Sequence, residues 1–212
     1  MRRRHDPAVD LWEPLSVDAV SSLIDGTTAW LSGGVGIDHW LGRVTRRHGD
    51  VDVSVTRRDR AAFLASLPGS LRPFAAQDGW LTPLDELGPA DAGPDDAGPD
   101  NVWCRDQRSG RWVLQVNAED GDDTTWVYRR DPSVVLPWRR AVLVVAGVRT
   151  VAPEVQLLWK SRAPRPVDES DRRHVLHRLD AGAQTWLRHA IRTAHPDSPW
   201  AIATDDQVPS AR

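Results

Sequence analysis

Lysine and cysteine are almost missing from this chain of 212 residues, because Lys160 and Cys104 are the only residues of their kinds. A single cysteine excludes both a disulfide framework and a cysteine-based zinc site within one chain. This composition fits a reducing cytoplasm, where we expect the protein. Since arginine supplies the remainder of the 27 basic residues, the one lysine at position 160 points to a specific role.

Long apolar segments and a strong charge imbalance are also lacking. The longest apolar run, Ala141 to Gly147, is far shorter than the roughly 20 residues that cross a bilayer, so we expect no membrane partner. The basic start, Met1 to Arg4, leads into acidic positions instead of an apolar stretch, and we expect no signal peptide. The net charge of −3 and the scattered arginines disfavour nucleic acid as a partner.

The first part of the chain alternates between helical and strand patterns. Gly33-Gly34 separates a β-prone stretch, residues 28–32, from residues with helical apolar spacing that end at Gly42. Polar and β-branched residues alternate from Asp50 to Val55, which predicts a half-buried strand. The other patterns here predict helices over Ser16 to Asp25 and Arg57 to Leu67 and two short strands within Leu71 to Leu84.

A low-complexity segment, Glu86 to Asp100, opens the second part, and its Gly-Pro repeats with acidic residues predict a flexible acidic loop. Strand patterns and then helical patterns follow, with strands at 101–105, 112–117, 125–128 and 141–145 and helices at 153–162, 168–179 and 182–194. This order predicts an α+β fold, a mixed β-sheet flanked by helices. We expect one domain over residues 1–150, a C-terminal helical segment over 151–200 and a disordered tail over 201–212.

Two short motifs carry chemistry. Side chains alternate along a strand, so Asp50 and Asp52 project from the same face and can converge on Mg²⁺, which prefers oxygen ligands and substrate phosphates. Gly33-Gly34 begins a helix, and a helix N-terminus without Cβ atoms can receive a phosphate. Either motif alone is more often a pair of solvated acids or a plain turn. Together they indicate phosphoryl or nucleotidyl transfer.

The spacing of these motifs, with fifteen residues between Gly34 and Asp50, resembles the DNA polymerase β-like nucleotidyltransferase superfamily. More narrowly, residues 33–38 and 42–52 are similar to the aminoglycoside 2''-adenylyltransferase and lincosamide nucleotidyltransferase group. The likeness continues more loosely through residues 126–132, 152–160 and 165–171.

The resemblance implies the nucleotidyltransferase fold and an enzyme that moves a nucleoside monophosphate from ATP or another triphosphate to a hydroxyl of a small molecule. An aminoglycoside-like antibiotic is one candidate acceptor. The resemblance also implies metal binding and catalysis by Asp50 and Asp52, triphosphate binding by Gly33 and Gly34, and contact of Lys160 with substrate or phosphate.

Basic residues stand between the predicted helix and the Asp50 strand. We expect Arg46 to neutralise phosphate, and His48 either to orient the loop or to belong to an ordinary solvated turn. Asp38, on the preceding helix, is expected to be a surface acid.

One position departs from the active members of the superfamily, which usually carry a third carboxylate on a later strand. The strand predicted at 112–117 has Gln115 at its inward position, and an amide cannot act as a general base. Glu119 or Asp120 could replace that carboxylate, although residues 119–123 are more typical of an acidic turn. Two alternatives to the enzyme therefore remain: a nucleotide-binding protein without turnover, or a toxin-like transferase acting on tRNA or protein. The acceptor, the preferred base and the oligomeric state are left open.

Overall fold

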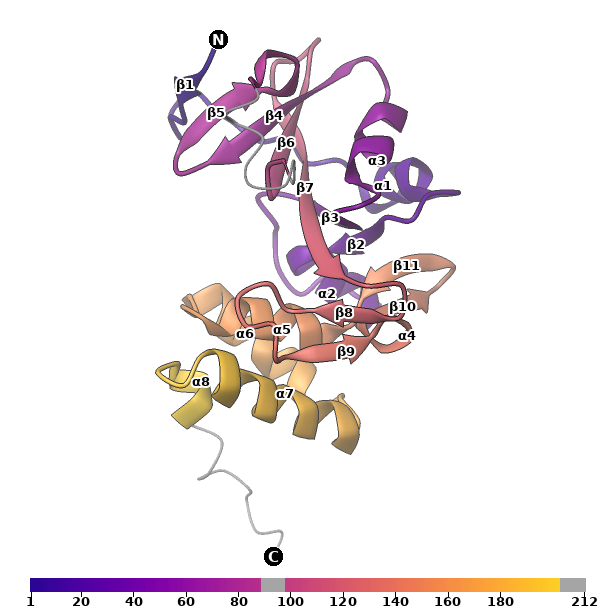
Figure 1. The fold of residues 1–212 in the computed structure, drawn as a ribbon, viewed down its shortest axis with the longest axis vertical. Coiled ribbons are helices and arrows are strands. Elements are labelled where there is room, and N and C mark those ends of the chain that lie inside the picture. The colour runs from indigo at the N-terminus through magenta and orange to yellow at the C-terminus, as the bar shows by residue number, and fades with distance from the viewer. Residues whose placement is uncertain (89–97, 203–212) are drawn as a thin grey trace, which may run out of the picture.

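A long mixed β-sheet organises the chain in a computed structural model, which describes residues 1–88 and 98–202. Its strands follow the order β1-β5-β4-β6-β7-β3-β2-β11-β10, and β8 and β9 extend it from the end of β7. Strands β4 to β6 lie in the upper part of Figure 1 with helices α1 and α3, whereas β8, β9 and the C-terminal helices form the lower part. The strand β7 runs from one part into the other. The strands span Arg3–Arg4 (β1), Trp30–Ser32 (β2), Asp52–Thr56 (β3), Leu71–Gln77 (β4), Trp80–Pro83 (β5), Asn101–Asp106 (β6), Trp112–Gly121 (β7), Thr125–Val127 (β8), Val135–Pro137 (β9), Val142–Val145 (β10) and Val148–Val151 (β11).

The helices begin and end where the sequence provides caps. Ser16 accepts a hydrogen bond from the backbone N–H of Ala19 and so caps α1. Gly42 ends α2 with a φ of 69°, a left-handed conformation that favours glycine. Pro153 and Pro166 stand in the first turns of α5 and α6. The helices span Val17–Ile24 (α1), Gly33–Leu41 (α2), Arg60–Ser66 (α3), Trp138–Ala141 (α4), Pro153–Ser161 (α5), Pro166–Leu176 (α6), Ala181–Ala194 (α7) and Pro199–Ile202 (α8), with a 3-10 turn at Leu84–Glu86 (η1).

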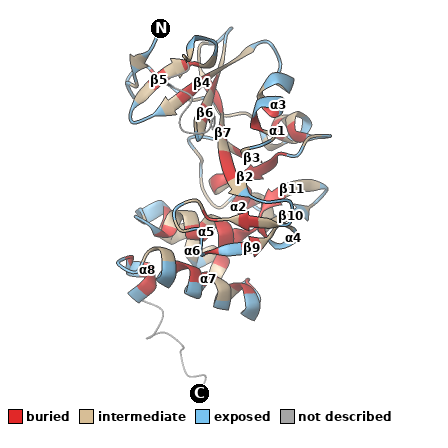
Figure 2. Cartoon of the chain, viewed as in Figure 1, coloured by how far each residue is buried: buried red, intermediate tan, exposed pale blue. Residues whose placement is uncertain are grey.

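Buried residues concentrate along the central strands and between α2 and the C-terminal helices (Figure 2). On β3, the apolar residues Val53 and Val55 are fully buried and join Val51 in a core beneath α1 and α3. A second core unites Trp30 of β2 and Ile37 of α2 with residues of α5 and α7. The second core therefore includes residues on both sides of position 150, where the sequence predicted a domain boundary.

Several predicted bounds are corrected by the structure. Asp50 precedes β3 instead of starting it, and the helix predicted from Arg57 begins at Arg60. β7 continues to Gly121, so residues 119–121 belong to a strand and not to an acidic turn. The sequence pattern missed β11, which pairs in parallel with β2.

Two predictions concern segments that are only partly described. The predicted flexible loop, 86–100, covers residues 89–97, which lie outside the described residues, although Glu86 ends η1. The predicted tail begins at Ala201, yet Ala201 and Ile202 belong to α8, and residues 203–212 lie outside the described residues. Within the described part of the chain, no helix is long and apolar enough to cross a membrane.

Candidate active site

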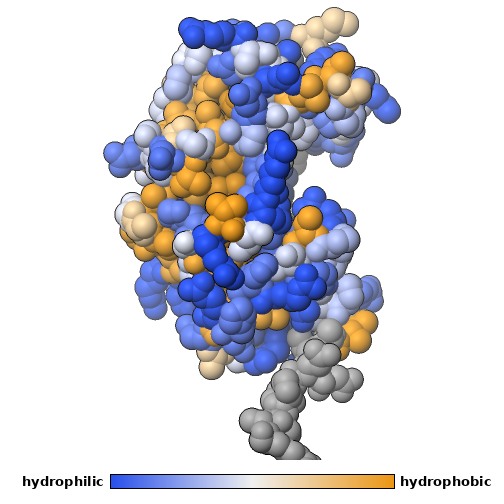
Figure 3. Space-filling model, turned by 180° about the vertical axis from the view of Figure 1, so that it is seen from behind, coloured by the Kyte–Doolittle hydropathy of each residue, from blue (hydrophilic) through white to orange (hydrophobic). Residues whose placement is uncertain are grey.

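A polar pocket of about 820 Å³ lies where α2, β3 and β7 meet α5 and α6. In the view from behind, the surface is indented between the upper and the lower part of the molecule (Figure 3). The pocket contains the residues predicted to bind metal or triphosphate, together with several for which the sequence predicted no role. The predicted residues are Gly33, Gly34, Arg46, Asp50, Asp52 and Lys160. Its lining consists of Gly33, Gly34, Arg46, Gly49, Asp50, Asp52, Gln115, Arg130, Gln156, Trp159, Lys160, Arg162, Ala163, Arg165, Val167 and Asp168.

The two predicted metal ligands enter this pocket together. Asp52, at the start of β3, is partly buried, whereas Asp50 is exposed just before the strand. Burial raises the pKa of the Asp52 carboxyl to about 6, and the charge of Asp50 adds to this shift. Asn117 Nδ2 donates a hydrogen bond of 3.1 Å to Asp52 Oδ1. The charged form of Asp52 is therefore destabilised by burial and by the neighbouring Asp50, and a divalent cation between the two side chains would offset that cost.

The two glycines are required by close approaches to site residues. Gly33 has a φ of 69°, and a Cβ there would overlap the carboxylate of Asp52. A Cβ on Gly34 would come within 2.5 Å of Arg46 Nη2 and 2.6 Å of His48 Nδ1. The backbone N–H of Gly33 donates to Gln156 Oε1 of α5 at 2.8 Å. The glycine turn is thus packed between β3 and the loop that carries Arg46 and His48.

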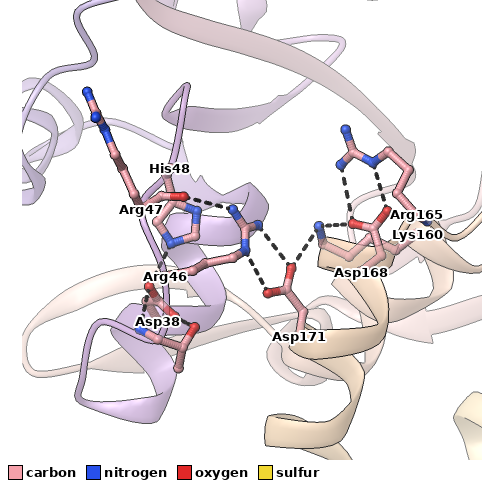
Figure 4. A network of polar contacts seen from close by, with 9 residues as sticks. Asp38, Arg46, Arg47, His48, Lys160, Arg165, Asp168 and Asp171 are labelled. Carbon is pink, nitrogen blue, oxygen red and sulfur yellow. Dashed lines mark hydrogen bonds and ion pairs between the residues drawn. The ribbon is translucent and has the colours of Figure 1, made fainter.

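Arg46 and Lys160 share a carboxylate on α6 (Figure 4). Asp171 accepts from Arg46 Nε at 3.0 Å and from Arg46 Nη2 at 3.1 Å, and its Oδ2 lies 3.1 Å from Lys160 Nζ. The hydrogen bond to Asp171 raises the pKa of Arg46 above its usual value. The side chain of Asp171 is only 1% exposed, so this contact is well shielded from water.

Asp168, one turn before Asp171, holds the other side of Lys160. Lys160 Nζ lies 2.7 Å from Asp168 Oδ1, and Arg165 Nε lies 2.9 Å from Asp168 Oδ2. Burial opposes the charged form of Asp168, yet the hydrogen bonds from Arg165 and Lys160 hold its pKa well below the usual range. The only lysine of the chain is therefore fixed by two carboxylates at the edge of the pocket.

Asp38 is not the surface acid that the sequence suggested, because it is 5% exposed and binds the loop that follows its helix. Its Oδ2 lies 2.6 Å from His48 Nε2 and accepts from the backbone N–H of Thr45 at 3.1 Å. The hydroxyl of Thr45 donates to Asp38 Oδ1 at 2.5 Å. These contacts order the loop that carries Arg46.

The residue facing Asp52 on β7 is Gln115, as expected from the sequence. Neither suggested replacement for a third carboxylate lines the pocket. Glu119 is buried and accepts from Trp126 Nε1 at 2.9 Å, and burial raises its pKa to about 7. Asp120 is ion-paired to Arg57 at 2.8 Å.

Sequence reasoning gave no role to Gln156, Asp168 and Asp171, which touch the predicted site from the C-terminal helices. The sequence connects residues 152–160 and 165–171 to the site only through a family resemblance. A usable signal was present: the two acids stand three positions apart on a helix, shortly after the single lysine.

Comparisons with known proteins agree with this geometry. The model of the family described as aminoglycoside-2''-adenylyltransferase matches residues 17–71. No curated protein matches the chain. The chain resembles the lincosamide antibiotic adenylyltransferase LnuA in its lincomycin-bound structure, with 16% identity, a TM-score of 0.51 and coverage of 76% of this chain and 97% of that one.

Two structures of the antibiotic-resistance factor ANT(2'')-Ia are also similar. A solution structure has 20% identity, a TM-score of 0.52 and coverage of 85% of this chain and 91% of that one. A crystal structure in complex with adenylyl-2''-tobramycin has 20% identity, a TM-score of 0.54 and coverage of 83% and 94%.

The sheet and its flanking helices therefore form a nucleotidyltransferase fold, as the sequence predicted. Within this class, the predicted resemblance to the aminoglycoside 2''-adenylyltransferase and lincosamide nucleotidyltransferase group is confirmed, and residues 17–71 carry the family match.

Proposed function

We propose that this protein is a nucleotidyltransferase that moves a nucleoside monophosphate from ATP or another nucleoside triphosphate to a small molecule, with Mg²⁺ as its metal. One observation carries the proposal. Asp50 and Asp52 share a pocket with the tightly packed turn at Gly33-Gly34 and with the cations of Arg46 and Lys160. The two carboxylates could bind a metal ion, and the glycine turn and the two cations could bind a polyphosphate beside it.

The residues fit a magnesium ion that is shared with the substrate. Among residues 1–88 and 98–202, no group of three or more histidine, cysteine or acidic side chains is placed to hold a metal. Asp50 and Asp52 would supply two carboxylates, and phosphate oxygens would complete the coordination, which is how Mg²⁺ is commonly bound. The ion would neutralise charge on the transferred phosphate and the leaving pyrophosphate.

The chain's own residues position the triphosphate. The backbone at Gly33 and Gly34 can approach phosphate oxygens closely because no side chain intervenes. Arg46 offers a planar guanidinium and Lys160 a compact ammonium, and both are held in place by Asp171. This pre-organisation stabilises the charge that develops on the phosphates during transfer.

For the acceptor, the expected class is a small molecule such as an aminoglycoside-like antibiotic. The matching family is named for aminoglycoside adenylylation, and two of the three similar structures contain lincomycin or adenylyl-2''-tobramycin. We propose a cytoplasmic enzyme that acts on a small molecule and not on nucleic acid.

The second candidate function is nucleotide binding without turnover, and Gln115 is the observation that favours it. It occupies the place opposite Asp52 on β7, where a carboxylate would otherwise serve as a base.

Two measurements separate these candidates. Titration calorimetry with MgATP tests the site, comparing the wild type with an Asp50→Asn/Asp52→Asn variant and with Asp197→Asn, an exposed carboxylate outside the pocket, as control. Mg²⁺-dependent binding that survives the double change would refute the metal site. Pyrophosphate release in the presence of an acceptor panel then distinguishes the enzyme from the binder.

A further inference from the structure

Four arginines line the pocket, and Arg130 and Arg162 are among those outside the set proposed to bind the triphosphate. Arg130 follows β8, Arg162 caps the end of α5, and both are exposed and line the pocket. Arg130 lies over the ring of Trp159, with its Cζ 4.9 Å from the centroid, and donates to Tyr128 Oη at 3.4 Å. Both arginines also act on one histidine: burial lowers the pKa of His195, and the charges of Arg130 and Arg162 lower it further. They therefore belong to one positively charged rim.

The carboxylates of the pocket already have partners or a metal to bind. Asp50 and Asp52 form the proposed magnesium site. Asp168 is held between Lys160 and Arg165, at 2.7 Å and 2.9 Å. An acceptor that carries several ammonium groups would meet arginine side chains at this rim, and like charges repel.

The position where a general base would remove the proton of an acceptor hydroxyl is occupied by a neutral amide. Gln115 faces Asp52 across β3 and β7 and lines the pocket. The next acids on β7 are engaged elsewhere, because Glu119 accepts from Trp126 and Asp120 pairs with Arg57. An amide cannot accept that proton as a general base.

From these two observations we infer that the acceptor oxygen is anionic before it reacts. The acceptor class is a small molecule with a carboxylate or a phosphate monoester, bound by Arg130 and Arg162. This inference rests on the proposed nucleotidyl transfer. For the same site, it replaces the aminoglycoside-like acceptor that the similar proteins suggest with an anionic small molecule.

Transfer to an anionic oxygen needs no general base in the protein. An acceptor oxygen that already bears a negative charge attacks the α-phosphorus and forms a new P–O bond. The bond from the α-phosphorus to the oxygen that bridges it to the β-phosphate breaks, and pyrophosphate leaves with that electron pair. No proton is removed from the acceptor. A carboxylate gives an acyl adenylate, and a phosphate monoester gives a phosphoanhydride.

A matched acceptor series tests the inference on the full chain with MgATP. Glucose, glucosamine, glucuronate and glucose 6-phosphate share a ring and differ in charge, and tobramycin adds a polycation. We expect pyrophosphate release with the two anionic sugars and little with the other three. Hydroxylamine trapping identifies an acyl adenylate, and ³¹P NMR identifies a phosphoanhydride, so the carboxylate and phosphate sources are distinguished.

Release that is as fast with glucose, glucosamine or tobramycin would overturn the anionic acceptor and leave the proposed transfer standing. The absence of pyrophosphate release with both glucuronate and glucose 6-phosphate would also overturn the inference of an anionic acceptor. Calorimetry with MgATP on the same sample shows whether the proposed function fails as well.

Variants provide a second, independent test. Arg130→Ala/Arg162→Ala should lower kcat/KM for the anionic acceptor about tenfold or more while the Kd for MgATP stays unchanged. Arg188→Ala, an exposed arginine on α7, is the matched control and should change neither. If the double variant weakens MgATP binding instead, the two arginines serve the nucleotide and the inference is wrong. Gln115→Glu should lower kcat/KM for the anionic acceptor through repulsion, and an increase would contradict the inference.

Discussion

Asp171 accepts two hydrogen bonds from the guanidinium of Arg46, from Nε at 3.0 Å and from Nη2 at 3.1 Å. The contact joins α6 to the loop before β3. Such a two-point pair fixes the plane of the guanidinium as well as its position. It aligns the guanidinium of Arg46 beside the glycine turn.

Asp171→Asn should therefore weaken MgATP binding about tenfold, because Arg46 and Lys160 lose the charge that orients them. The expected change lies in the KM for ATP, with a smaller change in kcat. Calorimetry and steady-state kinetics measure the two effects, and Asp197→Asn serves as the control. An unchanged KM in a folded Asp171→Asn protein would show that the contact has no part in nucleotide binding.

Lys160→Met should destabilise the fold as well as weaken ATP binding. Lys160 is 9% exposed and lies between Asp168 and Asp171, so its loss leaves buried carboxylates with less compensation. We expect a loss of about 2 kcal/mol in the free energy of unfolding. Urea denaturation measures it. Lys160→Arg keeps the charge and should recover most of the stability, and equal losses in both variants would contradict a charge effect.

Gly34→Ala should abolish tight ATP binding in a protein that remains folded. The added methyl would press on Arg46 Nη2 and His48 Nδ1, which lie 2.5 Å and 2.6 Å from the position of the new Cβ. Alanine is otherwise a better helix former than glycine, so the helix itself is not weakened. Gly69→Ala, where a Cβ meets nothing within 4 Å, is the control. Equal MgATP affinities of the two variants would exclude the steric effect.

Glu119→Gln should make the protein more stable at pH 8 than the wild type, but not at pH 4. Burial raises the pKa of Glu119 from 4.5 to about 7 in the folded protein. The folded state thus binds the proton more tightly, and this residue's contribution to stability falls as pH rises from about 4.5 to 7. The amide avoids that loss, which is on the order of 3 kcal/mol, and can still accept from Trp126.

Urea denaturation at several pH values checks this prediction, with Glu13→Gln as the exposed control. A difference between the Glu119→Gln and wild-type proteins that does not change with pH would contradict it.

The sequence predicted the part of the site that depends on local order. Gly33 and Gly34 open a helix, and Asp52 opens a strand, because each segment carries its own pattern of apolar residues. β2 and β3 then pair, with Ser32 opposite Asp52, and this brings the two motifs together. Their spacing along the chain therefore contained most of the information about the side of the pocket for which we propose metal and phosphate binding.

The remaining site depends on contacts between distant segments. Gln156 and Asp171 reach Gly33 and Arg46 only because α5 and α6 pack beside α2, and no local pattern shows such packing. A carboxylate on a helix is usually exposed, so the sequence suggested a surface acid at Asp38, but the following loop folds back over it. β11 was missed because its four residues include the polar Arg149 and Thr150 and gain their order from β2 and β10.

The hydrogen bond from Gly33 to Gln156 has a consequence for how the protein is made. The glycine turn and the two aspartates leave the ribosome well before α5 and α6 have been synthesised. At that stage, the nascent chain carries its acidic pair without the lysine and the carboxylates that complete the pocket. The pocket is thus completed late in translation, when the C-terminal helices dock.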